Sequence, residues 1–107
     1  IYRAVPLNGE QAPYSYYGTE MKKYLYGKVS VYKIFHTNGK LKSEVNYYLG
    51  YKDGVCRYYY ANGKPEREEH WILGNRQGTF KYYDKMGKLV KTAEYYNDNL
   101  VSETKAK

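Results

Sequence analysis

A chain of 107 residues is long enough for one domain, and its composition narrows what that domain can do. Tyrosine accounts for 17 residues, which argues against the aromatic-poor composition of disordered chains. The net charge of +7 favours an acidic partner, namely nucleic acid, anionic lipid or an acidic protein. The 11 acidic residues are mixed among the 18 basic ones, so solubility alone is the alternative explanation.

Residues 1–26 are a degenerate copy of a unit that recurs downstream. Residues 2–10 match residues 32–40 at an offset of 30, which is one period plus an insertion of six. The chain begins at Ile1 rather than Met, inside a strand-like unit, so we expect a trimmed N-terminus with sequence missing upstream. That expectation favours an exported protein, periplasmic or on the cell surface.

Three clearer copies follow, and Gly39, Gly63 and Gly87 are 24 residues apart. A fixed period of this length indicates one repeated supersecondary unit. The copies cover residues 27–50, 51–74 and 75–100, with a C-terminal tail at 101–107, and all belong to a single domain, 1–107. Gly50 and its equivalent Gly74 become Asp98 in the third copy, as expected of a terminal cap.

Each unit is predicted to be a β-hairpin. Asn-Gly between aromatic and β-branched runs predicts a two-residue type I′ turn, in which both residues have positive φ. The predicted strands are 29–36, 41–49, 55–60, 66–73, 79–83 and 89–97. A glycine every dozen residues and the lack of a 3.6-residue period argue against helices.

The two-residue turn also fixes the register of each hairpin. It places Lys33 opposite Glu44 and, one unit on, Arg57 opposite Glu68. Two opposite-charge pairs at the same place support this register, and each contributes ~0.2–1 kcal/mol. The third unit has Lys81 opposite Thr92, so the charge pair is not kept there.

Alternation along the strands assigns residues to two faces. The first face, the better candidate for the core, carries Tyr32, Ile34, Leu41, Tyr47, Cys56, Tyr58, Pro65, Trp71, Phe80, Tyr82, Leu89 and Tyr95. The second face carries the charge pairs together with Phe35, Tyr48, Tyr59, Ile72, Tyr83 and Tyr96. A single-layer sheet cannot bury both faces, so the second face is a candidate binding surface.

Two sets of residues are candidates for binding. The candidate partner-binding residues are the aromatic ones of the second face: Phe35, Tyr48, Tyr59, Tyr83 and Tyr96. Cross-strand packing is the alternative role for these rings. The candidate polyanion or lipid contacts are the lysines after the turns: Lys40, Lys64 and Lys88. Solubility and protection of the sheet edge are the alternative role for the lysines.

No residues point to catalysis, to a cofactor or to a metal. His36 and His70 fall on different hairpins and opposite faces, so a shared metal site is not expected. Cys56, the only cysteine, excludes an intrachain disulfide and fits a small apolar core residue. None of the serines has the glycine context of a nucleophile elbow. We therefore expect a protein that is not an enzyme.

Three stretches carry a family resemblance: residues 58–64 (YYYANGK), 47–50 (YYLG) and 71–74 (WILG). Together with the glycines at 54 and 78 they resemble the bacterial variant of the MORN repeat family. The resemblance implies an all-β protein, with tandem hairpins that form a single elongated, twisted antiparallel sheet.

The resemblance also implies contact with a protein or a membrane rather than catalysis, and some bacterial members carry an antitoxin label. The Gly-x-Trp signature of eukaryotic MORN repeats, for which lipid binding has been proposed, is absent. The expected function is a repeat scaffold that binds another protein through its aromatic face. The alternatives are polyanion or membrane-surface binding and an antitoxin-like role. A homo-oligomer through edge strands is a further expectation, and nucleic acid is not expected as a partner.

Overall fold

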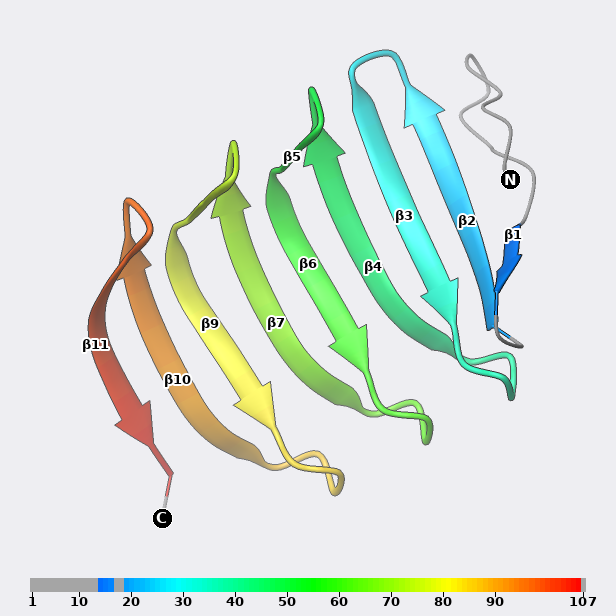
Figure 1. Cartoon of the computed structure of the whole chain (residues 1–107). Helices are drawn as coiled ribbons and strands as arrows, with labels where there is room; N and C mark the ends of the chain where they lie inside the picture. Colours follow the sequence, from blue (N-terminus) through cyan, green and yellow to red (C-terminus); the bar gives the residue numbers. More distant parts are fainter. Residues whose placement is uncertain (1–13, 17–18, 107) are drawn as a thin grey trace.

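The computed structural model describes residues 14–16 and 19–106, and these residues form one antiparallel sheet (Figure 1). The strands are β1 (Tyr14–Tyr16), β2 (Thr19–Tyr26), β3 (Val29–Phe35), β4 (Leu41–Tyr48), β5 (Tyr51–Lys52), β6 (Gly54–Tyr59), β7 (Pro65–Ile72), β8 (Asn75–Arg76), β9 (Gly78–Tyr83), β10 (Leu89–Tyr96) and β11 (Asn99–Lys105).

The sheet is a meander in a single layer. Its order is β1-β2-β3-β4-β6-β7-β9-β10-β11, with the short strands β5 and β8 paired to β4 and β7. The molecule measures 44 × 32 × 19 Å, and the described residues contain no helix. It follows that no helix in this part of the chain is long and apolar enough to cross a membrane. The predicted fold, hairpin repeats side by side in one open antiparallel sheet, is confirmed (Figure 1).

The predicted register is confirmed in all three hairpins. Lys33 pairs with Glu44 in β3–β4. Arg57 pairs with Glu68 in β6–β7. The third hairpin, β9–β10, pairs Lys81 with Thr92.

The type I′ turn predicted at Asn-Gly is wrong. The amide of Gly39 donates to the carbonyl of His36 (2.9 Å), and the amide of His36 donates to the carbonyl of Lys40 (2.7 Å). Gly39 has φ of 90°, whereas Asn38 is not among the residues with positive φ. The loop therefore has three residues, 37–39, and only its glycine needs a left-handed conformation.

A β-bulge at the start of the returning strand compensates for the extra loop residue. Phe35 pairs with Leu41, but Ile34 pairs with Ser43, so Lys42 is an extra residue in β4. The same shift occurs in the second and third hairpins. Bulged strands bend, and Figure 1 shows β4, β7 and β10 bending close to these turns. Two irregularities thus restore the register that a two-residue turn would have produced.

The bulge also moves three residues to another face. Leu41, Pro65 and Leu89 pair with Phe35, Tyr59 and Tyr83, and directly paired residues share a face. They therefore lie on the second face, so their predicted place on the first face is wrong. Alternation counted along the strand fails there because the extra residue inverts it.

Type I′ geometry occurs at the opposite end of the sheet, between consecutive hairpins. Leu49 (φ 53°) and Gly50 (φ 85°) both have positive φ, and so do Leu73 (φ 44°) and Gly74 (φ 85°). The third connection keeps this geometry with Asn97 and Asp98 at φ of 52° and 70°. Losing the glycine therefore does not change the backbone of the last turn, because Asn and Asp tolerate the left-handed region.

The first face holds the core, as predicted. The buried residues are Ser43, Val45, Cys56, Glu69, Phe80 and Ala93, and the register places all of them on this face. Rings cover them in place of a second layer. Phe80 lies 5.9 Å from the Trp71 ring and 4.8 Å from the Tyr95 ring, between centroids. The Tyr32 and Tyr47 rings meet edge to face at 5.1 Å.

Two long strands lie outside the predicted set. β2 falls in the predicted degenerate first repeat, residues 1–26, for which no strand was predicted, and β11 extends into the predicted C-terminal tail. β11 pairs with β10 through a bulge after Glu94. The predicted match of residues 2–10 to the repeat lies outside the described residues.

Candidate protein-interaction surface

The five predicted aromatic residues are together on the second face, in two rows. Phe35, Tyr59 and Tyr83 occupy equivalent positions next to the Asn-Gly and Met-Gly turns. Tyr48 and Tyr96 lie next to the type I′ turns, where β4 and β10 end. Tyr96 is 65% exposed, and the other four are half-buried. The face therefore presents rings at both ends of the first and third hairpins, whereas the second has Ile72 at its type I′ end.

A row of alternating charge separates the two aromatic rows. Neighbouring strands pair Lys33 with Glu44, Glu44 with Arg57, Arg57 with Glu68 and Glu68 with Lys81. Opposite charges directly across from one another stabilise a sheet modestly. Arg57 Nε is 3.9 Å from Glu68 Oε1, whereas His70 Nε2 is only 3.1 Å from Glu68 Oε2. The row is thus a stabilising feature that carries no net negative charge.

On the first face, cations lie over the rings that cover the core. Arg67 Cζ is 4.0 Å from the centre of the Tyr58 ring, and Lys91 Nζ is 4.3 Å from that of Tyr82. Burial raises the pKa of both tyrosine hydroxyls. Lys52 Nζ lies 4.8 Å above the Trp71 ring. These rings already have partners within the chain, so the first face is a packed surface rather than a free recognition surface.

Glu69 connects this packing beneath the rings. Its Oε1 accepts a hydrogen bond from Trp71 Nε1 (2.9 Å), and its Oε2 lies 2.8 Å from Arg67 Nε. That short distance is an ion pair without hydrogen-bond alignment, because the buried Arg67 Nε has no hydrogen-bond partner. Burial lowers the pKa of Arg67, but the effects of Glu69 and Tyr58 together raise it by more, so the net shift of the pKa is upward.

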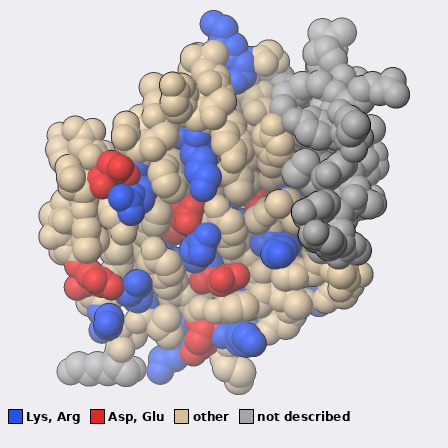
Figure 2. Space-filling model, viewed as in Figure 1, with Lys and Arg blue, Asp and Glu red and all other residues tan. Residues whose placement is uncertain are grey.

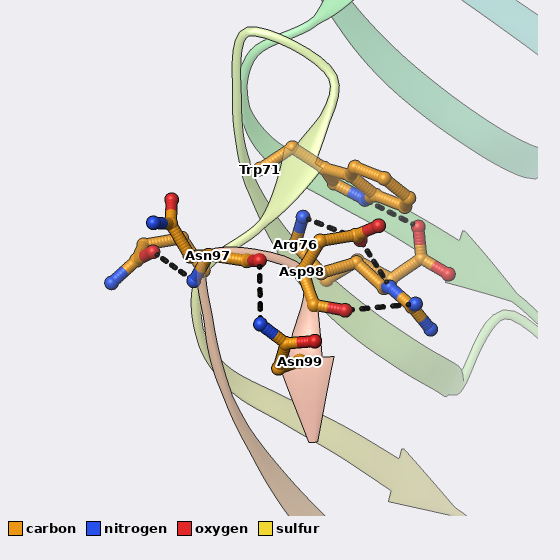
Figure 3. Close-up of polar contacts among 7 residues, drawn as sticks. Trp71, Arg76, Asn97, Asp98 and Asn99 are labelled. Carbon is orange, nitrogen blue, oxygen red and sulfur yellow. Dashed lines mark hydrogen bonds and ion pairs between the residues drawn. The ribbon is translucent and has the colours of Figure 1, made fainter. Parts of the chain in front are cut away.

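The last type I′ turn is held by an ion pair (Figure 3). Arg76 Nε is 2.7 Å from Asp98 Oδ1, and the Arg76 amide donates to the same oxygen. These hydrogen bonds lower the pKa of the Asp98 carboxyl. Arg76 also lies 4.5 Å from the centre of the Tyr95 ring. Asp98 thus replaces the glycine of the earlier turns with a residue that binds its neighbour.

The asparagines of the turns connect one hairpin to the next. Asn38 Nδ2 donates to the carbonyl of Ala61 (2.8 Å), and Asn62 Nδ2 donates to that of Lys85 (2.9 Å). The Oδ1 atom of each asparagine accepts from the amide two residues later, at 2.9 and 2.8 Å. One amide group therefore closes its own turn and holds the next repeat.

The predicted turn lysines are exposed, and the side chains of Lys40 and Lys64 lie across the following turn. Lys40 Nζ is 3.5 Å from the carbonyl of Asn62, and a Cβ at Gly63 would lie 3.6 Å from Lys40 Cδ. Lys64 crosses Gly87 in the same way. Basic and acidic side chains are intermixed on the face turned to the viewer in Figure 2. The three lysines are thus at equivalent sites, and the stems of Lys40 and Lys64 are packed against the next turn.

The two histidines contact different groups and do not contact each other. His36 Nε2 donates to the carbonyl of Tyr59 (2.9 Å), while His70 contacts Glu68. Burial raises the pKa of the Cys56 thiol, which matches a core residue. Within residues 27–106, no three His, Cys, Asp or Glu side chains are grouped so that they could hold a metal ion.

Sequence reasoning missed four exposed apolar residues near the type I′ turns as a group. They are Leu49, Tyr51, Ile72 and Leu73, with exposed fractions of 54, 58, 56 and 48%. We name these four residues the leucine rim. The available signal was the Leu-Gly pair, which recurs 24 residues on at a point where the chain must turn.

Comparison with known proteins identifies the repeat. Residues 28–47 and 52–72 match the family model of the MORN repeat variant as two consecutive repeats. No curated protein and no solved structure matches the chain. Both matched segments coincide with hairpins of the sheet, β3–β4 and the β5–β7 segment. Two consecutive hairpins of the chain are thus repeats of the MORN repeat variant type.

Proposed function

We propose that this protein is a non-enzymatic repeat scaffold that binds another protein through the second face of its sheet. MORN repeat proteins are generally non-catalytic scaffolds, which often contact proteins or membranes. The observation that carries the proposal is the distribution of burial. All the buried side chains of the described residues lie on the first face, while rings remain on the second.

The chemistry of the second face suits a protein partner. Tyrosine dominates interface hot spots because it combines a large apolar ring with a hydroxyl. The two aromatic rows flank a row of alternating charge, so a partner would meet apolar contacts on either side of a polar stripe. The face is also repeated, which lets one partner contact several hairpins at once.

The test is recovery of a partner from an extract of the source cells, using immobilised protein and crosslinking. A variant with Tyr59→Ala and Tyr83→Ala should lose the partner that the unmodified protein retains. Met86→Ala is the matched control, since Met86 is 82% exposed in a turn and is not one of the aromatic residues of the second face. Failure to find any partner that depends on Tyr59 and Tyr83, with both variants folded by circular dichroism, would contradict the proposal.

A second candidate function is binding of a polyanion or an anionic membrane surface by Lys40, Lys64 and Lys88. The favouring observation is their placement at equivalent exposed turns, ~9–10 Å apart, the distance between alternate strands. Such binding should weaken steeply as salt is added. Absence of binding to heparin and to phosphatidylserine vesicles at low salt would remove this candidate.

A further inference from the structure

The leucine rim contains two residues that the stability of the fold does not explain. Leu49 and Leu73 have φ of 53° and 44°, a left-handed region that is unfavourable for residues with a Cβ. About half of each side chain is exposed, so burial offsets this only in part. Leucine is thus a poor choice for these two positions if folding alone matters.

The third connection of the same chain shows the alternative. Asn97 occupies the equivalent position with φ of 52°, and asparagine is a residue that tolerates this conformation. Its side chain is polar, and its backbone amide donates to Gln77 Oε1 (2.9 Å). The same backbone therefore forms without leucine, and the two leucines need another reason.

The spacing of the leucines indicates what could cover them. They lie at equivalent positions of adjacent hairpins, so they are ~9–10 Å apart, two strand spacings. An α-helix advances ~10.5 Å in seven residues, and residues seven apart share a face. In an extended strand, residues on one face recur every ~6.8 Å, which does not match. A helix lying across the hairpins fits this rim better than a strand.

The surrounding charges indicate the polar part of the partner. Lys28, Lys52 and Arg76 flank the connections, and their carboxylate neighbours are already used. Asp98 binds Arg76, and Asp53 Oδ1 accepts from the amide of Leu73 (3.0 Å). Lys28 is exposed, with no ion pair to any described residue. Arg76 is held by Asp98 and Lys52 lies over the Trp71 ring, so Lys28 is the cation of this border that is left for an acidic residue of a partner.

We propose that the leucine rim binds an amphipathic α-helix of a partner protein, with apolar residues seven apart and acidic residues beside them. This deepens the proposed function, on which it rests, by naming the end of the sheet and the class of partner. Tyr51 and Ile72 supply the apolar surface between the leucines, and Lys28 contacts an acidic residue of the helix. Tyr48 of the second face adjoins the first of these two turns.

The test uses a synthetic alanine-rich helical peptide of three heptads, with leucine at every seventh position and glutamate at both sides. We expect it to bind the unmodified chain, and to bind a variant with Leu49→Asn and Leu73→Asn about tenfold or more weakly. Asparagine suits the left-handed turn, so the variant should remain folded. Met86→Asn, at the opposite end of the hairpins, should bind as the unmodified chain does.

Two further peptides separate the parts of the proposal. Exchanging glutamate for lysine should abolish binding, and so should moving the leucines to alternate positions. Equal binding of all three peptides, or equal affinity of the double variant, would overturn the assignment. Binding of phosphatidylserine vesicles that depends on Leu49 and Leu73, without peptide binding, would overturn it in favour of a lipid surface.

The partner-recovery experiment tests the proposed scaffold function separately from the helix-binding rim. A partner from cell extract that is lost with Tyr59→Ala and Tyr83→Ala, but kept with the double leucine variant, would leave the scaffold function standing. That same result would overturn the helix-binding rim. Loss of the partner in both variants would support the two together.

Discussion

The two ends of the hairpins differ in whether their recurring residues contribute to the stability of the fold. At the Asn-Gly end, Asn38 and Asn62 each use one side-chain amide for two bonds, one inside their turn and one to the next repeat. At the other end, Leu49 and Leu73 are half-exposed in left-handed turns. The first end is explained by folding, whereas the second is not.

This difference shows where function can be sought in a repeat protein. A residue that recurs because it holds the next repeat is accounted for by stability, and Asn62 is such a residue. A residue that recurs in a strained and exposed position is a better candidate for recognition. Substitutions at the two ends should therefore change stability in different directions.

The largest effect is expected from Gly63→Ala at the Asn-Gly end. Gly63 has φ of 90°, which an alanine adopts only with strain, so we expect the free energy of unfolding to fall by about 1–3 kcal/mol. The space is not limiting, since the nearest atom to a new Cβ is Lys40 Cδ at 3.6 Å. Urea unfolding measures the change. An unchanged midpoint would show that the turn adopts another conformation freely.

Asn62→Ala should have the next largest effect. It removes the bond to the carbonyl of Lys85 and the acceptor for the amide of Lys64, so we expect a loss of about 1–2 kcal/mol. Asn62→Asp keeps the acceptor and should lose roughly half as much. The equivalent Met86→Ala, where no such amide exists, should change stability by less than about 0.5 kcal/mol. Equal stability of all three variants would refute the role of the asparagine ladder.

The smallest effect concerns pH at the third type I′ turn. Because Arg76 lowers the pKa of the Asp98 carboxyl in the folded state, the stabilisation is present above the unfolded pKa of ~3.9. It is lost as the pH falls through the lower folded value. Asp98→Asn should flatten this part of the stability profile between pH 5 and the acid limit of folding, measured by thermal unfolding. An identical profile in the variant would show that the exposed pair contributes nothing.

Much of the fold was predictable because the repeat determines it. The period of 24 and the pair of Arg57 with Glu68 were sufficient for the correct register. The turn type was wrong, because Asn-Gly suits both a two-residue turn and a three-residue loop followed by a bulge. The sequence around Lys42 contains no glycine or proline to mark that bulge, so Leu41 was assigned to the wrong face.

The surface was predictable in part. Alternation correctly grouped Phe35, Tyr59 and Tyr83 on one face, because they precede the bulges along the chain. It could not show that cations would cover Tyr58 and Tyr82, since that depends on side-chain geometry across strands. The strain at Leu49 and Leu73 was not predictable either, because Leu-Gly is not a typical type I′ pair.

The most direct test of this comparison is the free energy of unfolding of the variant with Leu49→Asn and Leu73→Asn. Asn97 already adopts the same turn conformation, so the account predicts stability equal to or higher than that of the unmodified chain. A loss of about 1 kcal/mol or more for each substitution would contradict it. That result would mean that the leucines stabilise the fold, as the asparagines do at the other end of the hairpins.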